Sequence, residues 1–214
     1  MTDIAVIDYG MGNLRSVSQA LEHVAPGKTV IVTSDPAQIA AAERVVFPGQ
    51  GAMPDCMREL DARGLRSAVI AAAADKPFLG ICIGLQLLFE HSEEGNADGL
   101  SILSGKVKRF AGQMRDTAGG KLKVPHMGWN QVYQQNHEHP LWHDIDSGER
   151  FYYVHSYYVE PTESGLVAGV SEYPARFTSV VARDNIFAVQ FHPEKSHNAG
   201  LKLLSNFVQW NGRP

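Results

Sequence analysis

The first hundred residues alternate between short apolar runs and longer amphipathic stretches. Residues 4–7 are consecutively apolar, which predicts a buried strand, and the glycine-rich residues 10–12 predict a turn after it. Asn13 is a suitable N-cap, and apolar residues then recur at helical spacing until Pro26 and Gly27 interrupt the pattern. The chain is therefore predicted to begin with a strand, a turn and a helix.

The same alternation continues to about residue 90. We predict strands at residues 28–33, 44–47 and 77–81. Helices are predicted after the capping residues 34–36, in two stretches separated at Gly64, and at residues 83–90. Strands that alternate with helices are typical of an open, mostly parallel α/β sheet with helices on both faces.

From about residue 105 the pattern becomes rich in strands. Runs typical of strands occupy residues 106–110, 151–159, 166–170, 179–182 and 186–191, and apolar positions in residues 196–210 predict a final helix. Consecutive strands joined by turns favour antiparallel pairing. We therefore predict antiparallel additions in the C-terminal half, within a single domain of residues 1–214.

Composition and charge exclude several classes of protein. The 214 residues carry 19 basic and 23 acidic side chains, so no strong positive field is available for nucleic acid or an anionic membrane. The apolar runs are far shorter than the ~20 residues that cross a bilayer, and no basic leader precedes the first strand. We expect a cytoplasmic protein, whose two cysteines, Cys56 and Cys82, remain thiols.

Cys82 is a candidate nucleophile. It lies between Gly80 and Gly84 where an apolar strand is predicted to meet a helix, the layout of a sharp turn that exposes a catalytic side chain. The first turn of a helix also favours a thiolate. The alternative is an inert, buried thiol, which is the better interpretation for Cys56 because no glycine pair surrounds it.

His192 and Glu194 are candidate partners for this thiol. They follow the predicted strand 186–191, and Pro193 between them favours an extended backbone at His192. Alternate residues of an extended segment face the same side, so Glu194 can orient the imidazole and leave its other nitrogen for Cys82. Taken alone, a His-Pro-Glu sequence is more often a turn, so the hypothesis depends on Cys82.

An oxyanion would need backbone donors close to the thiol. The amide of Ile83 follows the candidate nucleophile directly, and the loop with Gln50 and Gly51 follows the predicted strand 44–47. Glycines in that loop would let a peptide turn its amide toward the site. An ordinary turn is the competing interpretation of this loop.

Other motifs predict neither a cofactor nor a metal. Gly10 and Gly12 resemble the start of a dinucleotide-binding loop, but the third glycine is absent. His137, His139 and His143 lack the regular spacing of a zinc site, so a solvated loop is the better interpretation.

Three sequence stretches together resemble the signatures of class I glutamine amidotransferase domains. They are PGQG at residues 48–51, GICIGLQ at residues 80–86 and FHPEKS at residues 191–196, and the resemblance spans nearly the whole chain. It implies a flavodoxin-like fold. It also implies that Cys82 attacks the side-chain amide of glutamine, that His192 passes a proton to the departing ammonia, and that Glu194 orients His192.

Further stretches are similar to one group within that family. DYGMGN at residues 8–13, PHMGWN at residues 125–130 and YVHSY at residues 153–157 resemble glutaminase subunits that form heterodimers with a (β/α)8 cyclase of histidine biosynthesis. The resemblance implies that ammonia passes to this cyclase. It also implies that glutamine and the oxyanion are bound by Gln50, Gly51, Ile83, Gln86, Ser156 and Tyr157. It further implies that the partner interface includes Asn13, Trp129 and Lys195.

Two other functions remain open from the residues alone. A free-standing Cys-His-Glu hydrolase of the same fold would need no partner, and a noncatalytic flavodoxin-like binding module would use Cys82 only for packing. Activity that depends on a partner would distinguish a glutaminase subunit from the free-standing hydrolase. A thiol reagent that modifies Cys82 faster than Cys56 would distinguish an enzyme from the noncatalytic module.

Overall fold

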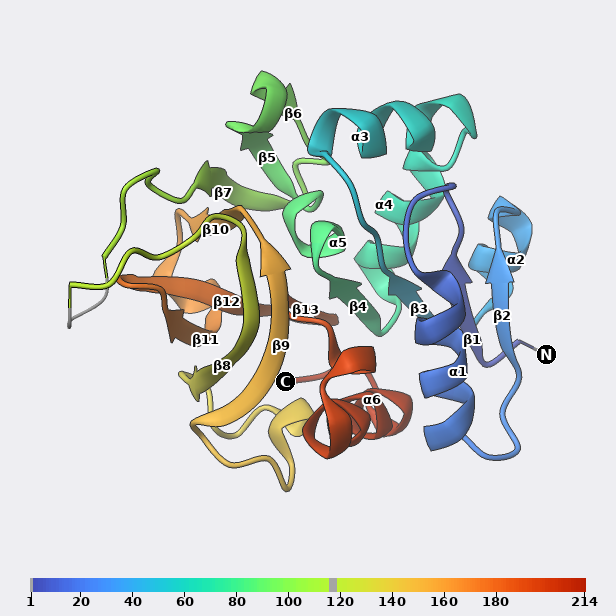
Figure 1. Cartoon of the computed structure of the whole chain (residues 1–214). Coiled ribbons are helices and arrows are strands. Elements are labelled where there is room, and N and C mark those ends of the chain that lie inside the picture. The colour runs from blue at the N-terminus through green and yellow to red at the C-terminus, as the bar shows by residue number, and fades with distance from the viewer. Residues whose placement is uncertain (1, 116–118) are drawn as a thin grey trace.

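The computed structural model describes residues 2–115 and 119–214, in which helices cover both faces of a long mixed sheet (Figure 1). The helices are α1 (Leu14–Val24), α2 (Pro36–Ala41), α3 (Met53–Ala62), α4 (Arg66–Asp75), α5 (Ile83–Gln86) and α6 (His197–Gln209). The strands are β1 (Ile4–Ile7), β2 (Val30–Thr33), β3 (Arg44–Phe47), β4 (Phe78–Ile81), β5 (Phe89–Ser92), β6 (Ala97–Asp98), β7 (Leu103–Arg109), β8 (His126–Gln134), β9 (Glu149–His155), β10 (Tyr157–Pro161), β11 (Val167–Glu172), β12 (Arg176–Arg183) and β13 (Ile186–Val189).

The sheet has a parallel half and a mostly antiparallel half. Its strands follow the order β2-β1-β3-β4-β13-β12-β10-β7-β5-β6, with β11, β8 and β9 branching from β12. Every pair from β2 to β13 is parallel, whereas β13-β12, β12-β10 and β10-β7 are antiparallel. This arrangement confirms the predicted α/β fold with antiparallel additions in the C-terminal half.

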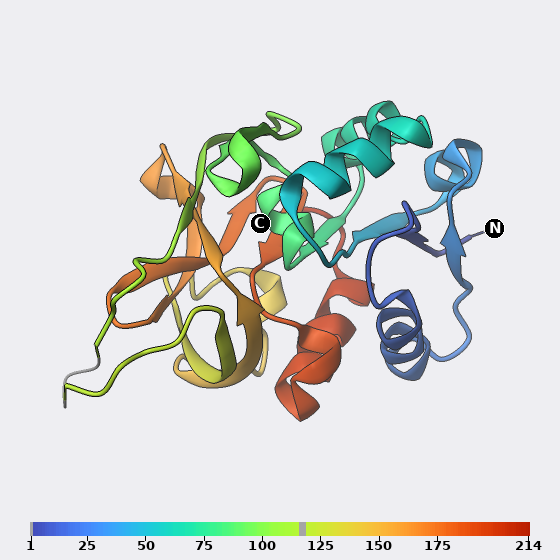
Figure 2. The same cartoon turned by 45° about the horizontal axis from the view of Figure 1, so that its top comes forward.

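Side chains of β1 alternate between the two faces of the sheet. Ile4 and Val6 pack in one buried cluster with residues of α1 and α6, while Ile7 packs in the other with residues of α2, α3 and α4. In Figure 2, α1 and α6 accordingly lie below the parallel strands and α3 lies above them. Burying an aliphatic side chain of this size contributes about 1.5–3 kcal/mol, so both layers stabilise the sheet.

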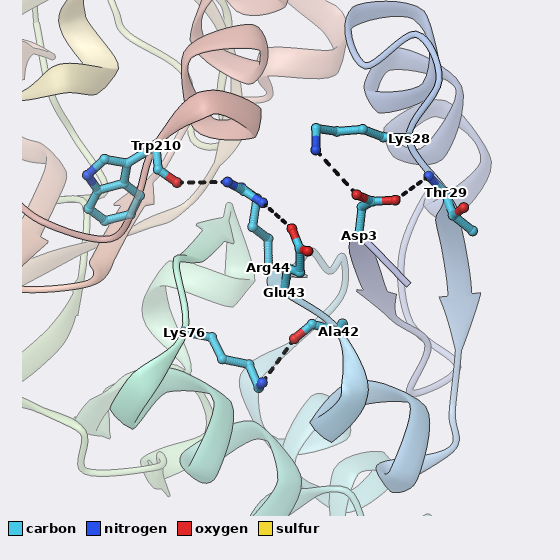
Figure 3. Close-up of polar contacts among 8 residues, drawn as sticks. All are labelled: Asp3, Lys28, Thr29, Ala42, Glu43, Arg44, Lys76 and Trp210. Carbon is cyan, nitrogen blue, oxygen red and sulfur yellow. Dashed lines mark hydrogen bonds and ion pairs between the residues drawn. The ribbon is translucent and has the colours of Figure 1, made fainter. Parts of the chain in front are cut away.

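Polar contacts tie the amino ends of the parallel strands together (Figure 3). Arg44, at the start of β3, pairs with Glu43 and donates to the carbonyl of Trp210 at 3.2 Å. Lys76, before β4, donates to the carbonyl of Ala42 at 2.9 Å. These contacts lie at the amino edge of the sheet, whereas ligands of open α/β sheets bind at the opposite, carboxyl edge.

Two predicted elements are wrong. Residues 83–90 form one helical turn and then strand β5, because the amides of Leu100 and Leu103 bind the carbonyls of Leu87 and Leu88. Residues 151–159 form two strands that break at Ser156, because β9 pairs with β8 while β10 pairs with β7 and β12. Strand β8 is absent from the prediction, because its apolar and polar residues do not alternate clearly.

None of the helices among the described residues has the length and apolar character needed to span a membrane.

Candidate active site

Three neighbouring parallel strands end at the candidate site. In the sheet, β4 lies between β3 and β13, with Phe47 opposite Gly80 and Val189 opposite Ile81. Parallel strands have their carboxyl ends at the same edge, so the segments that follow them meet there. These segments carry the loop of residues 48–51, Cys82, and residues 190–194.

The backbone of Cys82 is strained and held from both sides. Its φ of 57° and ψ of −111° lie in a region that residues with a Cβ rarely occupy. The amide of Cys82 donates to the carbonyl of Val189 at 2.8 Å, and its carbonyl accepts from the amide of Leu85 at 3.1 Å. The chain therefore turns sharply at Cys82, as the flanking glycines predict.

Both glycines beside Cys82 are required by packing. A Cβ on Gly80 would lie 2.9 Å from the Cβ of Ala188 on the neighbouring strand. A Cβ on Gly84 would collide with the carbonyl oxygen of Phe47. The first turn of α5 can approach the sheet this closely only without side chains at these two positions.

His192 and Glu194 form a buried pair after β13. Nδ1 of His192 lies 2.8 Å from Oε1 of Glu194, and the two side chains are 3% and 1% exposed. The His192 amide donates to the carbonyl of Tyr152 at 2.9 Å, and its carbonyl accepts from the Ser196 hydroxyl at 2.6 Å. These backbone bonds attach the turn to β9 and α6, and the contact with Glu194 sets the direction of the imidazole.

The imidazole also interacts with the thiol of Cys82. Burial lowers the pKa of His192, but a hydrogen bond and the charge of the Cys82 sulfur, together with Glu194, outweigh it and raise the pKa to about 10. Because Nδ1 faces Glu194, Nε2 remains for the sulfur. The structure thus brings the three predicted side chains together, with a protonated imidazole stabilised beside the sulfur.

A pocket of about 400 Å³ opens beside these side chains. Cys82 and His192 line it, as do all six residues predicted for glutamine and the oxyanion, and Lys195. The residues that line the pocket without having been predicted are Glu94, Pro125, Val154 and His155.

Two predicted interface residues lie outside this pocket. Trp129 on β8 is 41% exposed and stacks on His197, with ring centroids 4.9 Å apart. Met127, on the same strand, is 62% exposed. Asn13 caps α1, since its Oδ1 accepts from the amide of Ser16 at 3.4 Å.

Gln190 is a site residue that the sequence interpretation missed. Its Nε2 donates to Sγ of Cys82 at 3.9 Å, and Sγ also lies 4.0 Å from the carbonyl oxygen of Val154. The available signal is its position, because Gln190 is a polar residue at the end of an apolar strand, two residues before His192.

Two interpretations of residues outside the site have different outcomes. Burial raises the pKa of the Cys56 thiol to about 11, in agreement with a packed and unreactive side chain. The expectation of a solvated histidine loop is wrong for His139, which is 2% exposed and lies against Phe187 and Trp210. The aromatic contacts of this histidine outweigh the polarity of its neighbours in sequence.

The chain is similar to known proteins over nearly its whole length. The family model for glutamine amidotransferase class-I matches residues 5–210. The imidazole glycerol phosphate synthase subunit HisH of Aromatoleum aromaticum is 68% identical over 98% of this chain and 99% of its own length. The subunit of the same name from Dechloromonas aromatica is 69% identical over 97% of this chain and 96% of its own length.

Solved structures share the fold at much lower identity. The glutaminase domain of Trypanosoma brucei CTPS with bound acivicin aligns with a TM-score of 0.67 at 17% identity, covering 100% of this chain and 98% of that one. A structure described as a glutamine amidotransferase aligns with a TM-score of 0.70 at 13% identity, covering 96% of this chain and 99% of that one. The chain therefore belongs to the class I glutamine amidotransferase family and, within it, to the HisH subunits of imidazole glycerol phosphate synthases.

Proposed function

We propose that the chain hydrolyses the side-chain amide of glutamine and supplies the ammonia to a synthase partner. The observation that carries this proposal is that Cys82 and His192 line one pocket while the buried Glu194 carboxylate binds Nδ1 of the same imidazole. A nucleophile, a base and an orienting carboxylate are the groups that acyl transfer from an amide requires.

The first half-reaction forms a thioester. The Cys82 thiolate attacks the amide carbon, a carbon–sulfur bond forms, and the carbonyl oxygen becomes an oxyanion. Nε2 of the His192 imidazolium then gives its proton to the amide nitrogen as the carbon–nitrogen bond breaks, so ammonia leaves. Glu194 holds Nδ1 and keeps Nε2 directed at the reacting atoms.

The second half-reaction restores the site. Neutral His192 takes a proton from water, and the resulting hydroxide attacks the thioester. The carbon–sulfur bond breaks, glutamate leaves, and Cys82 is again a thiolate beside a protonated imidazole. The raised pKa of His192 suits this cycle, because a protonated imidazole is then available to give its proton to the leaving nitrogen.

We place the oxyanion between two backbone segments. The amide of Ile83 belongs to the first turn of α5, where amides have no acceptor within the helix. The loop containing Gln50 and Gly51 lies on the adjacent strand end and lines the same pocket. Gln86, Ser156 and Tyr157 line the remainder and would hold the rest of the glutamine molecule.

We further propose a (β/α)8 cyclase as the partner in a cytoplasmic heterodimer. Ammonia released into water would be protonated and diluted, so a covered interface would keep it reactive. The exposed aromatic and apolar side chains of β8, Trp129 and Met127, are suited to such an interface. Asn13 and Lys195 would contribute polar contacts to the partner.

Glutamate release tests the proposal. The chain is measured alone, with the cyclase subunit, and with the cyclase and its nucleotide ligand, and we expect activity to rise at each step. Cys82→Ala is expected to abolish release while partner binding and thermal stability are retained. Cys56→Ser is the matched control: it removes the other thiol but keeps a donor for the Gln50 carbonyl, which the Cys56 thiol reaches at 3.6 Å, and it should retain turnover.

Other outcomes would contradict this function. Turnover that persists in Cys82→Ala would exclude the thioester route. Equal glutamine or peptide hydrolysis with and without the cyclase would favour a free-standing hydrolase. Equal, slow reaction of Cys82 and Cys56 with a thiol reagent would favour a noncatalytic module.

A further inference from the structure

Gln190 connects two parts of the pocket through a single buried side chain. It is 0% exposed, its Oε1 accepts from Nε2 of Gln86 at 3.0 Å, and its Nε2 donates to Sγ of Cys82. The donor Gln86 settles the orientation of the Gln190 amide, because an oxygen must face that N–H and the NH2 group must then face the sulfur.

Gln86 is held equally firmly. Its Nε2 carries two hydrogens, and these bind Oε1 of Gln190 and the carbonyl oxygen of Tyr157, the latter at 3.2 Å. Among the described residues none donates to Oε1 of Gln86, and the side chain lines the pocket. The oxygen is therefore the atom that Gln86 has available for a ligand, and the ligand group opposite must be a hydrogen-bond donor.

A pair of buried histidines secures the carbonyl of Tyr157. Nδ1 of His155 lies 2.8 Å from this carbonyl, which can only accept, so Nδ1 carries the proton and Nε2 of His155 is an acceptor. Nδ1 of His126 lies 2.9 Å from that Nε2 and must therefore be the donor. Nε2 of His126 is in turn an acceptor, in reach of the side-chain amide of Asn130 at 3.4 Å.

These hydrogen bonds form one continuous network in which each group can act only as the donor or only as the acceptor described above. It passes from His126 through His155 to the Tyr157 carbonyl, where it meets the bonds from Gln86 through Gln190 to Cys82. Buried polar groups that satisfy one another in this way restrict each side chain to one orientation. Loss of one amide would leave its neighbours free to rotate or unpaired.

We propose that Gln190 is a fourth functional side chain of the site, which donates to the sulfur of Cys82 and fixes the amide of Gln86 with its oxygen toward the substrate. This inference rests on the proposed glutaminase function. The donated hydrogen bond stabilises charge on the sulfur, and the accepted bond keeps Gln86 in the orientation that selects a donor group of glutamine.

Two substitutions separate these roles. Gln190→Leu removes both bonds, and we expect kcat/KM for glutamine to fall about 10- to 100-fold, since hydrogen bonds to charged groups are among the strongest in proteins. Gln190→Glu retains an acceptor for Gln86 but replaces the donor to the sulfur by an oxygen. At neutral pH we expect its kcat to fall about 10-fold or more while KM stays within about twofold of the parent value.

Gln134→Leu is the matched control. Gln134 is also buried, at 6% exposed, and its Nε2 donates to the carbonyl of Ile145, far in sequence from the proposed catalytic residues. Its loss should reduce stability to a similar degree and leave kcat and KM unchanged. Parent-like kcat in Gln190→Glu, or activity losses no larger than those of Gln134→Leu, would overturn the inference.

A measurement that leaves Gln190 in place covers the case in which Gln190 variants do not fold. With glutamine side chains labelled by nitrogen-15, the Gln190 amide protons should exchange slowly, and Cys82→Ser should shift them while leaving those of Gln134 in place. Exchange as fast as that of an exposed glutamine would refute the bond to sulfur. Absence of glutamate release by the unsubstituted chain with its partner would instead refute the proposed function.

Discussion

Three buried histidines determine how the stability of the fold responds to acid. His126, His139 and His155 are 4%, 2% and 5% exposed. Burial lowers the pKa of His126 and of His139 to about 4 and that of His155 to about 3. In the unfolded chain a histidine titrates near ~6.5, so between these values the unfolded state binds more protons than the folded state.

The magnitude follows from proton linkage. Each histidine that is neutral when folded and charged when unfolded changes stability by about 1.4 kcal/mol per pH unit, so three give about 4 kcal/mol per pH unit. The contribution is fully present above pH ~6.5 and is lost as the pH falls toward ~4. Between pH 6.5 and 5 the loss is about 5 kcal/mol at most, a large part of a typical stability of about 5–15 kcal/mol. His192 opposes this trend only near its upper end, because its raised pKa keeps it protonated in the folded state while in the unfolded chain it loses its proton above pH ~6.5.

Urea unfolding at several pH values between 7 and 5 measures this slope. His139→Asn retains an acceptor for the Leu141 amide, which now donates to Nδ1 of His139 at 3.2 Å, but cannot titrate. We expect the slope to fall from about 4 to about 3 kcal/mol per pH unit in this variant. A slope below about 1.4 kcal/mol per pH unit in the parent protein would refute the reasoning, because it corresponds to fewer than one proton.

Two further predictions concern the alkaline limb and the turn at Cys82. The raised pKa of His192 contributes stability below pH ~6.5 that is lost as the pH rises toward about 10, so the melting temperature should fall over this range. The melting temperature should fall less steeply in Glu194→Gln. An equally steep fall in this variant would argue against a stabilising His192–Glu194 pair. Gly84→Ala should lower the free energy of unfolding, measured by chemical denaturation, by about 1–3 kcal/mol or more, because the new Cβ would meet the Phe47 carbonyl. Gly112→Ala, which has open space around the new Cβ, should change the free energy of unfolding by less than about 0.5 kcal/mol. Equal stability of the two alanine variants would contradict the packing argument.

Local pattern was sufficient for the parallel half of the fold. Strands such as β1 are uniformly apolar and are bounded by turn residues, and α1 has a capping asparagine and a clear helical period. The candidate triad was accessible for a similar reason. Cys82 is flanked by glycines and His192 is followed by proline, so each carries a short-range sign of an unusual backbone.

The elements that failed are those with two competing local interpretations. Residues 83–89 are buried on every side, so their apolar run has no helical or strand period to distinguish. The run at residues 151–159 contains no turn signal before Ser156, although its two parts pair with different strands. Strand β8 is polar enough to resemble a loop, and pairing with β9 along seven positions makes it a strand.

The sequence by itself determined the order of strands and helices up to residue 81, the turn at Cys82 and the identity of three side chains suited to nucleophilic catalysis. Only the tertiary structure decided that Gln190 faces the sulfur, that His126 and His155 are hydrogen-bonded to each other, and that His139 is buried among aromatic rings. The physical reason is that the two kinds of interaction act over different separations along the sequence. Backbone propensity and periodicity act over a few residues, whereas these side chains obtain their partners from strands and loops distant in sequence, and the partners determine both orientation and charge.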